Sequence, residues 1–283
     1  MRFRLRRRGV DHGFVTPVPR ETAWERSEPV PLPGIVPTVP TAAVSRLLDR
    51  LRAGDDLAPL LPFRVLGTSQ NVADPLEIQK VQVTDDQYIK VNWLSTHPGD
   101  GSMRLRFGYG AEILDDWKDD PVGARGSERL FDRVFPVSRA VTRNRRLIGE
   151  IRRRIGGRPR FIQRILYSNS PGGGALFHHD FVPGQAGVVY AQLAGSTGWL
   201  TLPKRELKRM AKDLDNDRLI NHTGAFTRRL AAEGWFFILR PGDAILLPSF
   251  SWERVAWHSV FTIGRARNVA LSFGIAKETR HRN

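Results

Sequence analysis

The chain has 283 residues, of which 41% are hydrophobic and 26% are charged. This composition is ordinary for a soluble globular protein, and the length allows a substantial buried core. There are no cysteines, which excludes disulfides, thiolate metal sites and a cysteine nucleophile, so any metal must be bound by histidine and carboxylate.

The formal net charge is +15, from 44 Lys and Arg against 29 Asp and Glu. Such an excess attracts polyanions, and it has three interpretations: a nucleic-acid partner, a smaller anionic substrate, or a general preference for arginine. No run of 18 apolar residues occurs, so we expect no membrane-spanning helix. Residues 1–8 are basic but are not followed by the apolar stretch of a secretory signal. A cytoplasmic location is therefore expected.

Residues 1–40 are predicted to form an N-terminal arm. The segment is arginine-rich at its start and contains five prolines between positions 29 and 40. Proline lacks the backbone N–H that helices and central strands require. We therefore expect this basic, Pro-rich arm to run along the surface or to be partly disordered.

Residues 41–160 are predicted to contain helices and short strands that pack on the core. Apolar residues at helical spacing indicate a helix over 42–53, capped by Thr41 and stopped by Gly54. The predicted strands cover 80–83, 88–93 and 103–107, followed by a short helical piece over 111–117.

A basic amphipathic helix is predicted within 136–160, ending at Gly157. It has three possible roles. Its arginines could contact phosphates, they could dock on an acidic partner, or the helix could pack on the core with arginines on its outer face.

From residue 161 to residue 277 the sequence is β-rich. Strands are predicted at 161–167, 235–239, 244–247 and 268–274, with a helical insertion over 204–233 that contains helices near 205–214 and 227–233. The glycine run 172–174 is not a phosphate-binding loop, because neither Lys-Ser/Thr nor a helix follows it.

One short stretch, Leu176 to Phe181, contains His178, His179 and Asp180. In an extended strand alternate side chains share a face, so His178 and Asp180 point to one side and His179 to the other. A distant histidine, His258, could complete the set. Two imidazoles and one carboxylate with open positions form the facial triad of non-haem Fe(II) oxygenases.

The surroundings of these residues resemble the JmjC and cupin-like hydroxylases, a branch of the Fe(II)/2-oxoglutarate oxygenases. Four segments carry the resemblance: 177–180, 190–203 (YAQLAGSTGWLTLP), 240–248 (RPGDAILLP) and 257–260 (WHSV). The resemblance covers roughly residues 160–277. It implies a mainly β, α+β fold with flanking helices around a double-stranded β-helix, the jelly-roll or cupin-like core.

The resemblance also implies a chemistry. His178, Asp180 and His258 would bind Fe(II), and 2-oxoglutarate and O2 would take the remaining positions. The family couples the oxidative decarboxylation of 2-oxoglutarate to succinate with hydroxylation of a substrate. Asp180 argues against the halogenating variants, which lack the carboxylate.

Two departures from the family pattern concern the other site residues. Many JmjC-type enzymes hold the far carboxylate of 2-oxoglutarate with a lysine at the position of Thr197, which brings no charge, so a cation is expected from Arg267 or, second, from Arg164. The family's usual spacing would place the second histidine near Glu253. We prefer His258 because its neighbours match better.

On the predicted strand after the triad, Tyr190 and Gln192 share a face and would line the pocket if that face is inward.

The primary hypothesis is therefore an Fe(II)- and 2-oxoglutarate-dependent dioxygenase that hydroxylates a peptide or protein side chain or a small molecule. One alternative is a metal-dependent oxygenase or isomerase that does not use 2-oxoglutarate. Another is a non-enzymatic, basic cupin-like module that binds nucleic acid. The positive charge favours an anionic small molecule, an acidic peptide or protein, or RNA as partner.

Overall fold

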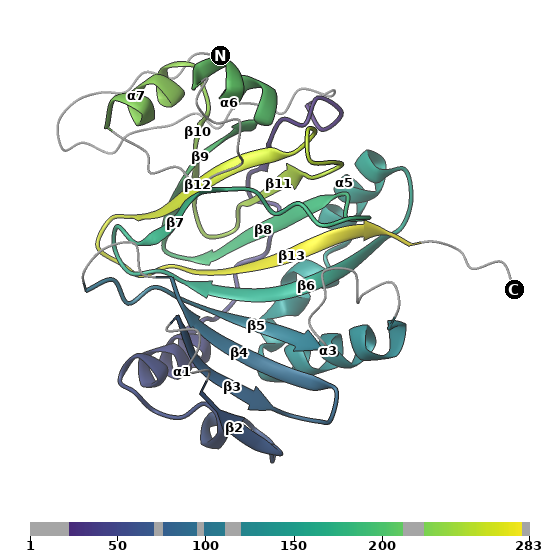
Figure 1. Cartoon of the computed structure of the whole chain (residues 1–283), viewed down its shortest axis with the longest axis vertical. Helices are drawn as coiled ribbons and strands as arrows, with labels where there is room; N and C mark the ends of the chain where they lie inside the picture. The colour runs from purple at the N-terminus through teal and green to yellow at the C-terminus, as the bar shows by residue number, and fades with distance from the viewer. Residues whose placement is uncertain (1–22, 71–75, 95–98, 111–119, 212–223, 279–283) are drawn as a thin grey trace, which may run out of the picture.

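The computed structural model describes residues 23–70, 76–94, 99–110, 120–211 and 224–278 (Figure 1). Its centre is a pair of facing antiparallel sheets. The large sheet has nine strands in the order β1-β11-β8-β13-β6-β5-β4-β3-β2, and the small sheet has four in the order β10-β9-β12-β7.

Eight consecutive strands, β6 to β13, form a double-stranded β-helix. The large sheet takes β6 (Pro159–Ser168), β8 (Gly187–Ala194), β11 (Ala244–Pro248) and β13 (Val269–Lys277). The small sheet takes β7 (Gly174–His178), β9 (Ser196–Pro203), β10 (Phe236–Leu239) and β12 (Ala256–Ile263). Apart from the consecutive strands β9 and β10, which pair with each other in the small sheet, the chain alternates between two facing sheets. This confirms the predicted mainly β class and jelly-roll core.

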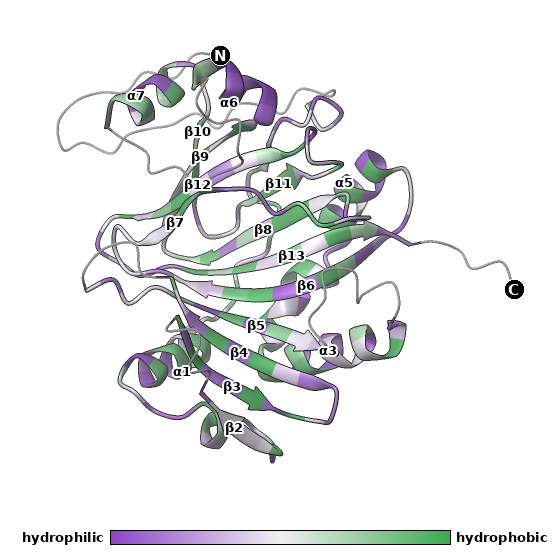
Figure 2. Cartoon of the chain, viewed as in Figure 1, coloured by the Kyte–Doolittle hydropathy of each residue, from purple (hydrophilic) through white to green (hydrophobic). Residues whose placement is uncertain are grey.

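Four further strands extend the large sheet beyond this core. They are β5 (Met103–Tyr109), β4 (Gln87–Trp93), β3 (Glu77–Gln82) and β2 (Gly67–Ser69). They alternate between two chemically different faces, visible as the changing hydropathy along β3 to β5 (Figure 2). Val81, Ile89 and Leu105 are completely buried toward the helices, whereas the residues between them, such as Lys80 and Lys90, point to the other side.

Helices cover the outer face of each sheet. The large sheet packs against α1 (Ala42–Arg52), α3 (Pro121–Val134), α4 (Arg139–Thr142) and α5 (Arg145–Ile155), and its outer residues share one core with them. The small sheet packs against α6 (Lys204–Met210) and α7 (Gly224–Ala232). A third core lies between the two sheets. In the described ranges, no helix combines the length and the hydropathy needed to cross a membrane.

The N-terminal segment differs from its prediction. Residues 30–32 form an edge strand, β1 (Val30–Leu32), paired with β11, and Trp24 and Val30 are almost fully buried. The surface arm predicted for residues 1–40 is therefore wrong for this part. Pro31 is compatible with a strand because β1 lies at the sheet edge, where a missing N–H breaks no ladder.

The predicted helices occur with shifted ends. The helix at 42–53 is α1, although the Thr41 side chain makes no capping hydrogen bond. The basic helix of 136–160 is divided into α4 and α5 and ends at Gly156, whose φ of +64° favours glycine, rather than at Gly157. The helix predicted over 205–214 is α6, ending at Met210, and the piece over 111–117 lies outside the described residues.

Candidate metal centre

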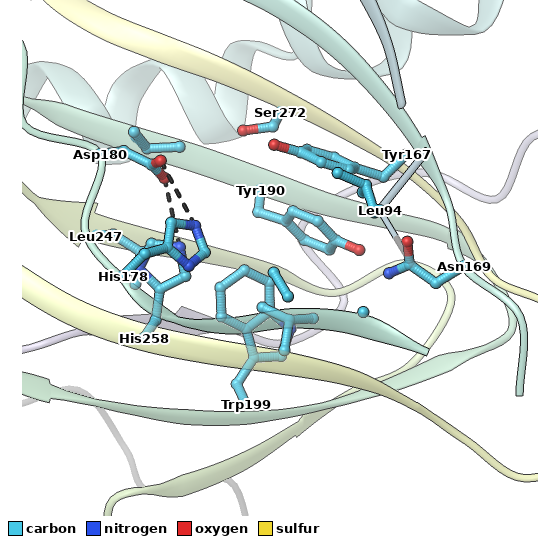
Figure 3. A pocket seen from close by; sticks show the side chains of 14 residues that line it. Leu94, Tyr167, Asn169, His178, Asp180, Tyr190, Trp199, Leu247, His258 and Ser272 are labelled. Atoms are coloured by element: carbon cyan, nitrogen blue, oxygen red, sulfur yellow. Dashed lines mark ion pairs between the residues drawn. The ribbon is translucent and has the colours of Figure 1, made fainter. Parts of the chain in front are cut away.

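Strand pairing brings the two distant histidines of the predicted triad together. His178 ends β7, and His258 lies directly opposite it on β12. Residues directly opposite in an antiparallel pair point to the same side of the sheet. The two imidazole rings are 4.2 Å apart between centroids, with His258 almost fully buried (Figure 3).

Asp180 lies two residues beyond His178 and faces both rings. Its Oδ1 is 3.7 Å from Nε2 of His178, and its Oδ2 is 3.4 Å from Nε2 of His258. Three donor-capable side chains thus converge, with all of their candidate ligand atoms within 4.8 Å of one another. The predicted triad is therefore assembled in the structure.

A backbone contact orients the first imidazole. Nδ1 of His178 is 2.7 Å from the carbonyl oxygen of Leu176. A carbonyl only accepts, so Nδ1 carries the proton and Nε2 keeps its lone pair directed at Asp180. This is the usual outer contact of a metal-binding histidine.

The surroundings keep His178 neutral. Burial lowers the pKa of His178 to about 4, and the neighbouring His258 lowers it too, although Asp180 acts in the opposite direction. A neutral imidazole is the form that binds metal.

Asp180 is held as a carboxylate. Burial alone would raise the pKa of Asp180, but His258, through charge and a hydrogen bond, and then His178 and His179 outweigh it, so the pKa lies below its ordinary value. An ionised carboxylate between two imidazoles is a donor set that suits a divalent transition metal.

These residues fit a single metal ion. Bonds of about 2.0–2.2 Å from a metal to imidazole nitrogen and carboxylate oxygen would bridge the observed separations of 3.4 and 3.7 Å. The ion would also satisfy the lone pair that Nε2 of His178 directs at Asp180. Fe(II) is the metal for which two histidines and one carboxylate are typical.

The triad borders a narrow cavity between the two sheets, with a volume of about 30 Å3. Its wall is aromatic: the Trp199 ring stacks on His258 at 5.5 Å, and Tyr190 meets Trp199 edge-on at 4.6 Å. The remaining lining residues include Leu94, Tyr167, Asn169, Val188, Leu247 and Ser272. None of the described lining residues is a lysine or an arginine.

The predicted cosubstrate residues on β8 and β9 differ in position. Tyr190 lines the cavity, and its hydroxyl accepts a hydrogen bond from Asn268 at 3.2 Å. Thr197 donates to Gln192 at 2.8 Å and accepts from the indole N–H of Trp199 at 3.0 Å. Thr197 and Gln192 thus bond to each other behind the aromatic wall and are not among the lining residues.

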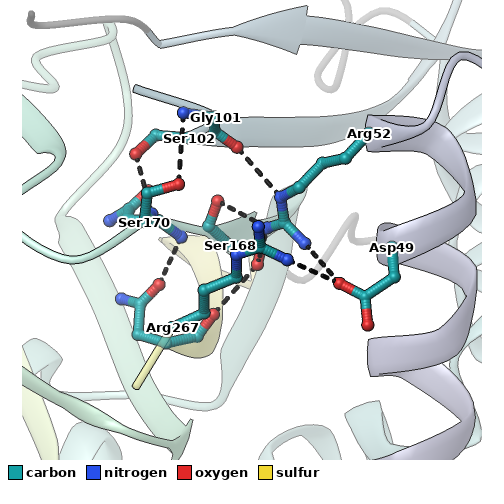
Figure 4. A network of polar contacts seen from close by, with 9 residues as sticks. Asp49, Arg52, Gly101, Ser102, Ser168, Ser170 and Arg267 are labelled. Carbon is teal, nitrogen blue, oxygen red and sulfur yellow. Dashed lines mark hydrogen bonds and ion pairs between the residues drawn. The ribbon is translucent and has the colours of Figure 1, made fainter. Parts of the chain in front are cut away.

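Neither arginine proposed as a cationic anchor lines the cavity. Arg267 is half-exposed and pairs with Asp49 of α1 at 2.8 Å, beside a network in which Arg52 donates to Ser168 (Figure 4). Arg164 is buried on the outer face of the large sheet and pairs with Glu128 of α3 at 3.1 Å. The expected anchoring role is not met by either position, because both side chains point toward helices.

The alternative ligand and the third histidine also lie apart from the triad. Glu253 pairs with Lys204 at 3.2 Å and with Lys208 at 3.4 Å, so the structure favours His258. His179 points away, as strand alternation predicts, and contacts the rings of Trp252 and Trp257.

Sequence reasoning missed Trp199, Tyr167 and Asn169 as cavity residues. A signal for Trp199 was present, since it shares a face of its strand with Thr197. Tyr167 and Asn169 come from the end of β6 and the following loop, and only the sheet pairing places them opposite the triad.

No protein-family model matches the chain, and neither does any curated protein. Solved structures do match. HygX from Streptomyces hygroscopicus, with nickel and 2-oxoglutarate bound, aligns over 90% of this chain and 84% of its own, at 11% identity and a TM-score of 0.40. YcfD, a ribosomal oxygenase from Escherichia coli, aligns over 92% of this chain and 51% of its own, at 14% identity and a TM-score of 0.39. At these scores, the fold assignment rests on the strand order given above.

Proposed function

We propose that this protein is a metal-dependent oxygenase, with Fe(II) held by His178, Asp180 and His258 and with 2-oxoglutarate and O2 as cosubstrates. The observation that carries the proposal is the convergence of a neutral imidazole, a carboxylate and a second imidazole at one end of a cavity between the sheets. Bound Fe(II) would activate O2, the oxidant, while 2-oxoglutarate would be oxidised to succinate and CO2, so that a substrate C–H bond is hydroxylated.

The chain's own residues would position and shield the reaction. The carbonyl oxygen of Leu176 fixes the orientation of His178, and the Trp199 ring stacks on the His258 ring. The apolar and aromatic wall would limit the access of water to the metal, which strengthens electrostatic interactions inside the cavity. The substrate would be a small molecule, a peptide or protein side chain, or RNA.

A second candidate is a metal-dependent oxygenase or isomerase that does not use 2-oxoglutarate. Two observations favour it: the described lining residues include no cation, and the cavity is narrow, with a volume of about 30 Å3. Side chains such as Leu94 and Tyr167 would have to move to admit a dicarboxylate.

The test is to load the purified apoprotein with Fe(II) without oxygen, add 2-oxoglutarate and record the visible charge-transfer band of the chelate. We expect a band in the wild type and none in Asp180→Ala or His258→Ala, with iron affinity reduced by more than about 100-fold, because each change removes a direct ligand. Glu253→Ala is the matched control and should keep the band.

The outcomes separate the two candidates. Iron bound without a band would reject 2-oxoglutarate and favour the second candidate. Unchanged iron content in both ligand variants, with their fold confirmed by circular dichroism, would reject the metal centre itself.

A further inference from the structure

A row of basic side chains leads away from the cavity on the same face of the large sheet. Cross-strand pairing places Ser272 opposite Ile165, Ile165 opposite Arg106, Arg106 opposite Lys90, and Lys90 opposite Lys80. Directly opposed residues point to one side. Because Ser272 lines the cavity, the row lies on the face of the large sheet that borders the cavity, and it extends along this face across β5, β4 and β3.

A neighbouring row places a fourth cation beside a residue that lines the cavity. Arg104 is opposite Tyr167, which lines the cavity, and hydrogen-bonds its side chain. Nε of Arg104 is buried and has no hydrogen-bond partner among the protein atoms. An unsatisfied buried N–H is costly, and an anionic group at the cavity mouth would satisfy it.

We name Lys80, Lys90, Arg104 and Arg106 the basic strip. Glu77, which pairs with Lys90 at 3.1 Å, is the one acidic residue in strands β3, β4 and β5. Lys80 lies over the Tyr88 ring at 4.3 Å, which positions the ammonium without neutralising it. Like charges directly opposite one another destabilise a sheet, so the strip is a cost to the fold that a bound polyanion would offset.

We propose that the basic strip binds the phosphate backbone of a single-stranded nucleic acid and directs one nucleotide into the cavity. This inference deepens the proposed function, since it names the substrate class of the metal centre. The triad lies between two sheets, with His258 almost fully buried, and a base or sugar inside a duplex would not reach it.

The chemistry of the strip favours phosphates over an acidic peptide. Neighbouring strands lie about 4.8 Å apart, so cations on adjacent strands can reach the same anionic group. A phosphate offers several acceptor oxygens and can bond two adjacent cations at once.

The other basic surface, helix α5, is in the wrong place for delivery to the metal. It buries Leu147 and Ile151 in the core on the outer face of the large sheet, opposite the cavity. Arg153 and Arg154 both pair with Glu150 of the same helix. This arrangement agrees with a core-packing helix and makes α5 a suitable control surface.

The experiment is fluorescence anisotropy of the full chain with a labelled single-stranded RNA of mixed sequence, at 50 to 300 mM salt. The test variant is Lys80→Gln/Arg106→Gln, which leaves the Lys90–Glu77 pair intact. The matched control is Arg153→Gln/Arg158→Gln, which removes the same charge from exposed positions around α5. Thermal melts establish that both variants are folded, and Lys80→Gln alone replaces the double variant if it is not.

We expect the strip variant to bind about 10-fold more weakly at 100 mM salt, with the slope of log K against log salt reduced by roughly 1.4, because each lost phosphate contact removes about 0.7. The control should change affinity less than about 2-fold. Equal losses in both variants, a larger loss in the α5 variant, or no wild-type binding at 50 mM salt would overturn the proposal. So would competition by polyglutamate as effective as that by unlabelled RNA at equal charge.

Binding is measured on metal-free protein, which keeps this result separate from the proposed function. RNA binding by the strip in a protein that binds no iron would refute the metal centre and leave the nucleic-acid site. An iron and 2-oxoglutarate band without RNA binding would refute only the nucleic acid as substrate.

Discussion

The two halves of the large sheet present different inner faces. The half formed by β11, β8, β13 and β6 is covered by the small sheet and contributes neutral, mostly apolar residues to the core between the sheets. No residue of β2–β5 belongs to that core. The register of β3–β5 turns four cations to the same side. Charge is costly in an enclosed space unless it is paired or binds a metal, which explains why Asp180, which follows β7 of the small sheet, lies between His178 and His258.

This difference suggests that the two halves of the large sheet have different roles. The covered half can hold a metal away from water, and the open half can attract a charged partner at little desolvation cost. The hydrogen-bonding ladder of the large sheet fixes the distance from the strip to Tyr167 and Ser272, which line the cavity beside the triad.

The largest predicted loss of stability comes from a core substitution on the face of β3–β5 that packs against the helices. Leu105 is completely buried, so Leu105→Ala should lower the free energy of unfolding by about 2–5 kcal/mol. Arg106→Gln, on the next residue but the opposite face, should change it by less than about 1 kcal/mol. Urea titration measures both. Similar losses would show that both faces of the extension are equally enclosed.

The second prediction concerns the pH dependence of stability, which tests whether His178 is enclosed beside the covered half of the sheet. The pKa of His178 is lowered from its ordinary 6.5 to about 4 in the folded state. Between these values the unfolded chain binds a proton that the folded chain does not, so stability falls as pH decreases from about 6.5 to 4. The contribution is roughly 3 kcal/mol across that window.

The measurement is chemical denaturation of the metal-free protein in chelator over this pH range. His178→Ala should flatten the pH dependence relative to the wild type. His179→Ala is the control, because its ring lies on the other side of the strand among Trp252 and Trp257, and it should leave the slope in place. A wild type whose stability is constant from pH 6.5 to 4 would contradict the enclosed, neutral imidazole.

Strand alternation predicted that His178 and Asp180 share a face, and the resemblance to a known family supplied His258 and the class of fold. His178 and Asp180 are local to each other, so period-two geometry alone places them together. His258 was found because its neighbours were recognisable, and the pairing of β7 with β12 explains its position. These features depend on short-range patterns.

The basic strip and the position of the arginines were not predictable in this way. Lys80, Lys90 and Arg106 become neighbours only through the register of three separate strands. A bulge at Gln163, whose φ is +49°, decides on which sheet face Arg164 lies. The position of Arg267 depends on the approach of α1 to the start of β13, where Arg267 pairs with Asp49. β1 was missed because its proline, Pro31, is tolerated only at the edge of a sheet, and the position of that edge depends on the whole sheet.

The smallest effect should come from Arg267, and it bears directly on the neutral cavity. Arg267 and Asp49 are about half exposed, so Arg267→Gln should cost less than about 1 kcal/mol. It should also leave the affinity for 2-oxoglutarate in the iron charge-transfer assay unchanged. If the variant loses the band while still binding iron, the guanidinium must leave Asp49 and enter the cavity when the dicarboxylate binds. The cavity would then receive its cation from Arg267 at the rim, and it would be neutral only in the protein without ligand.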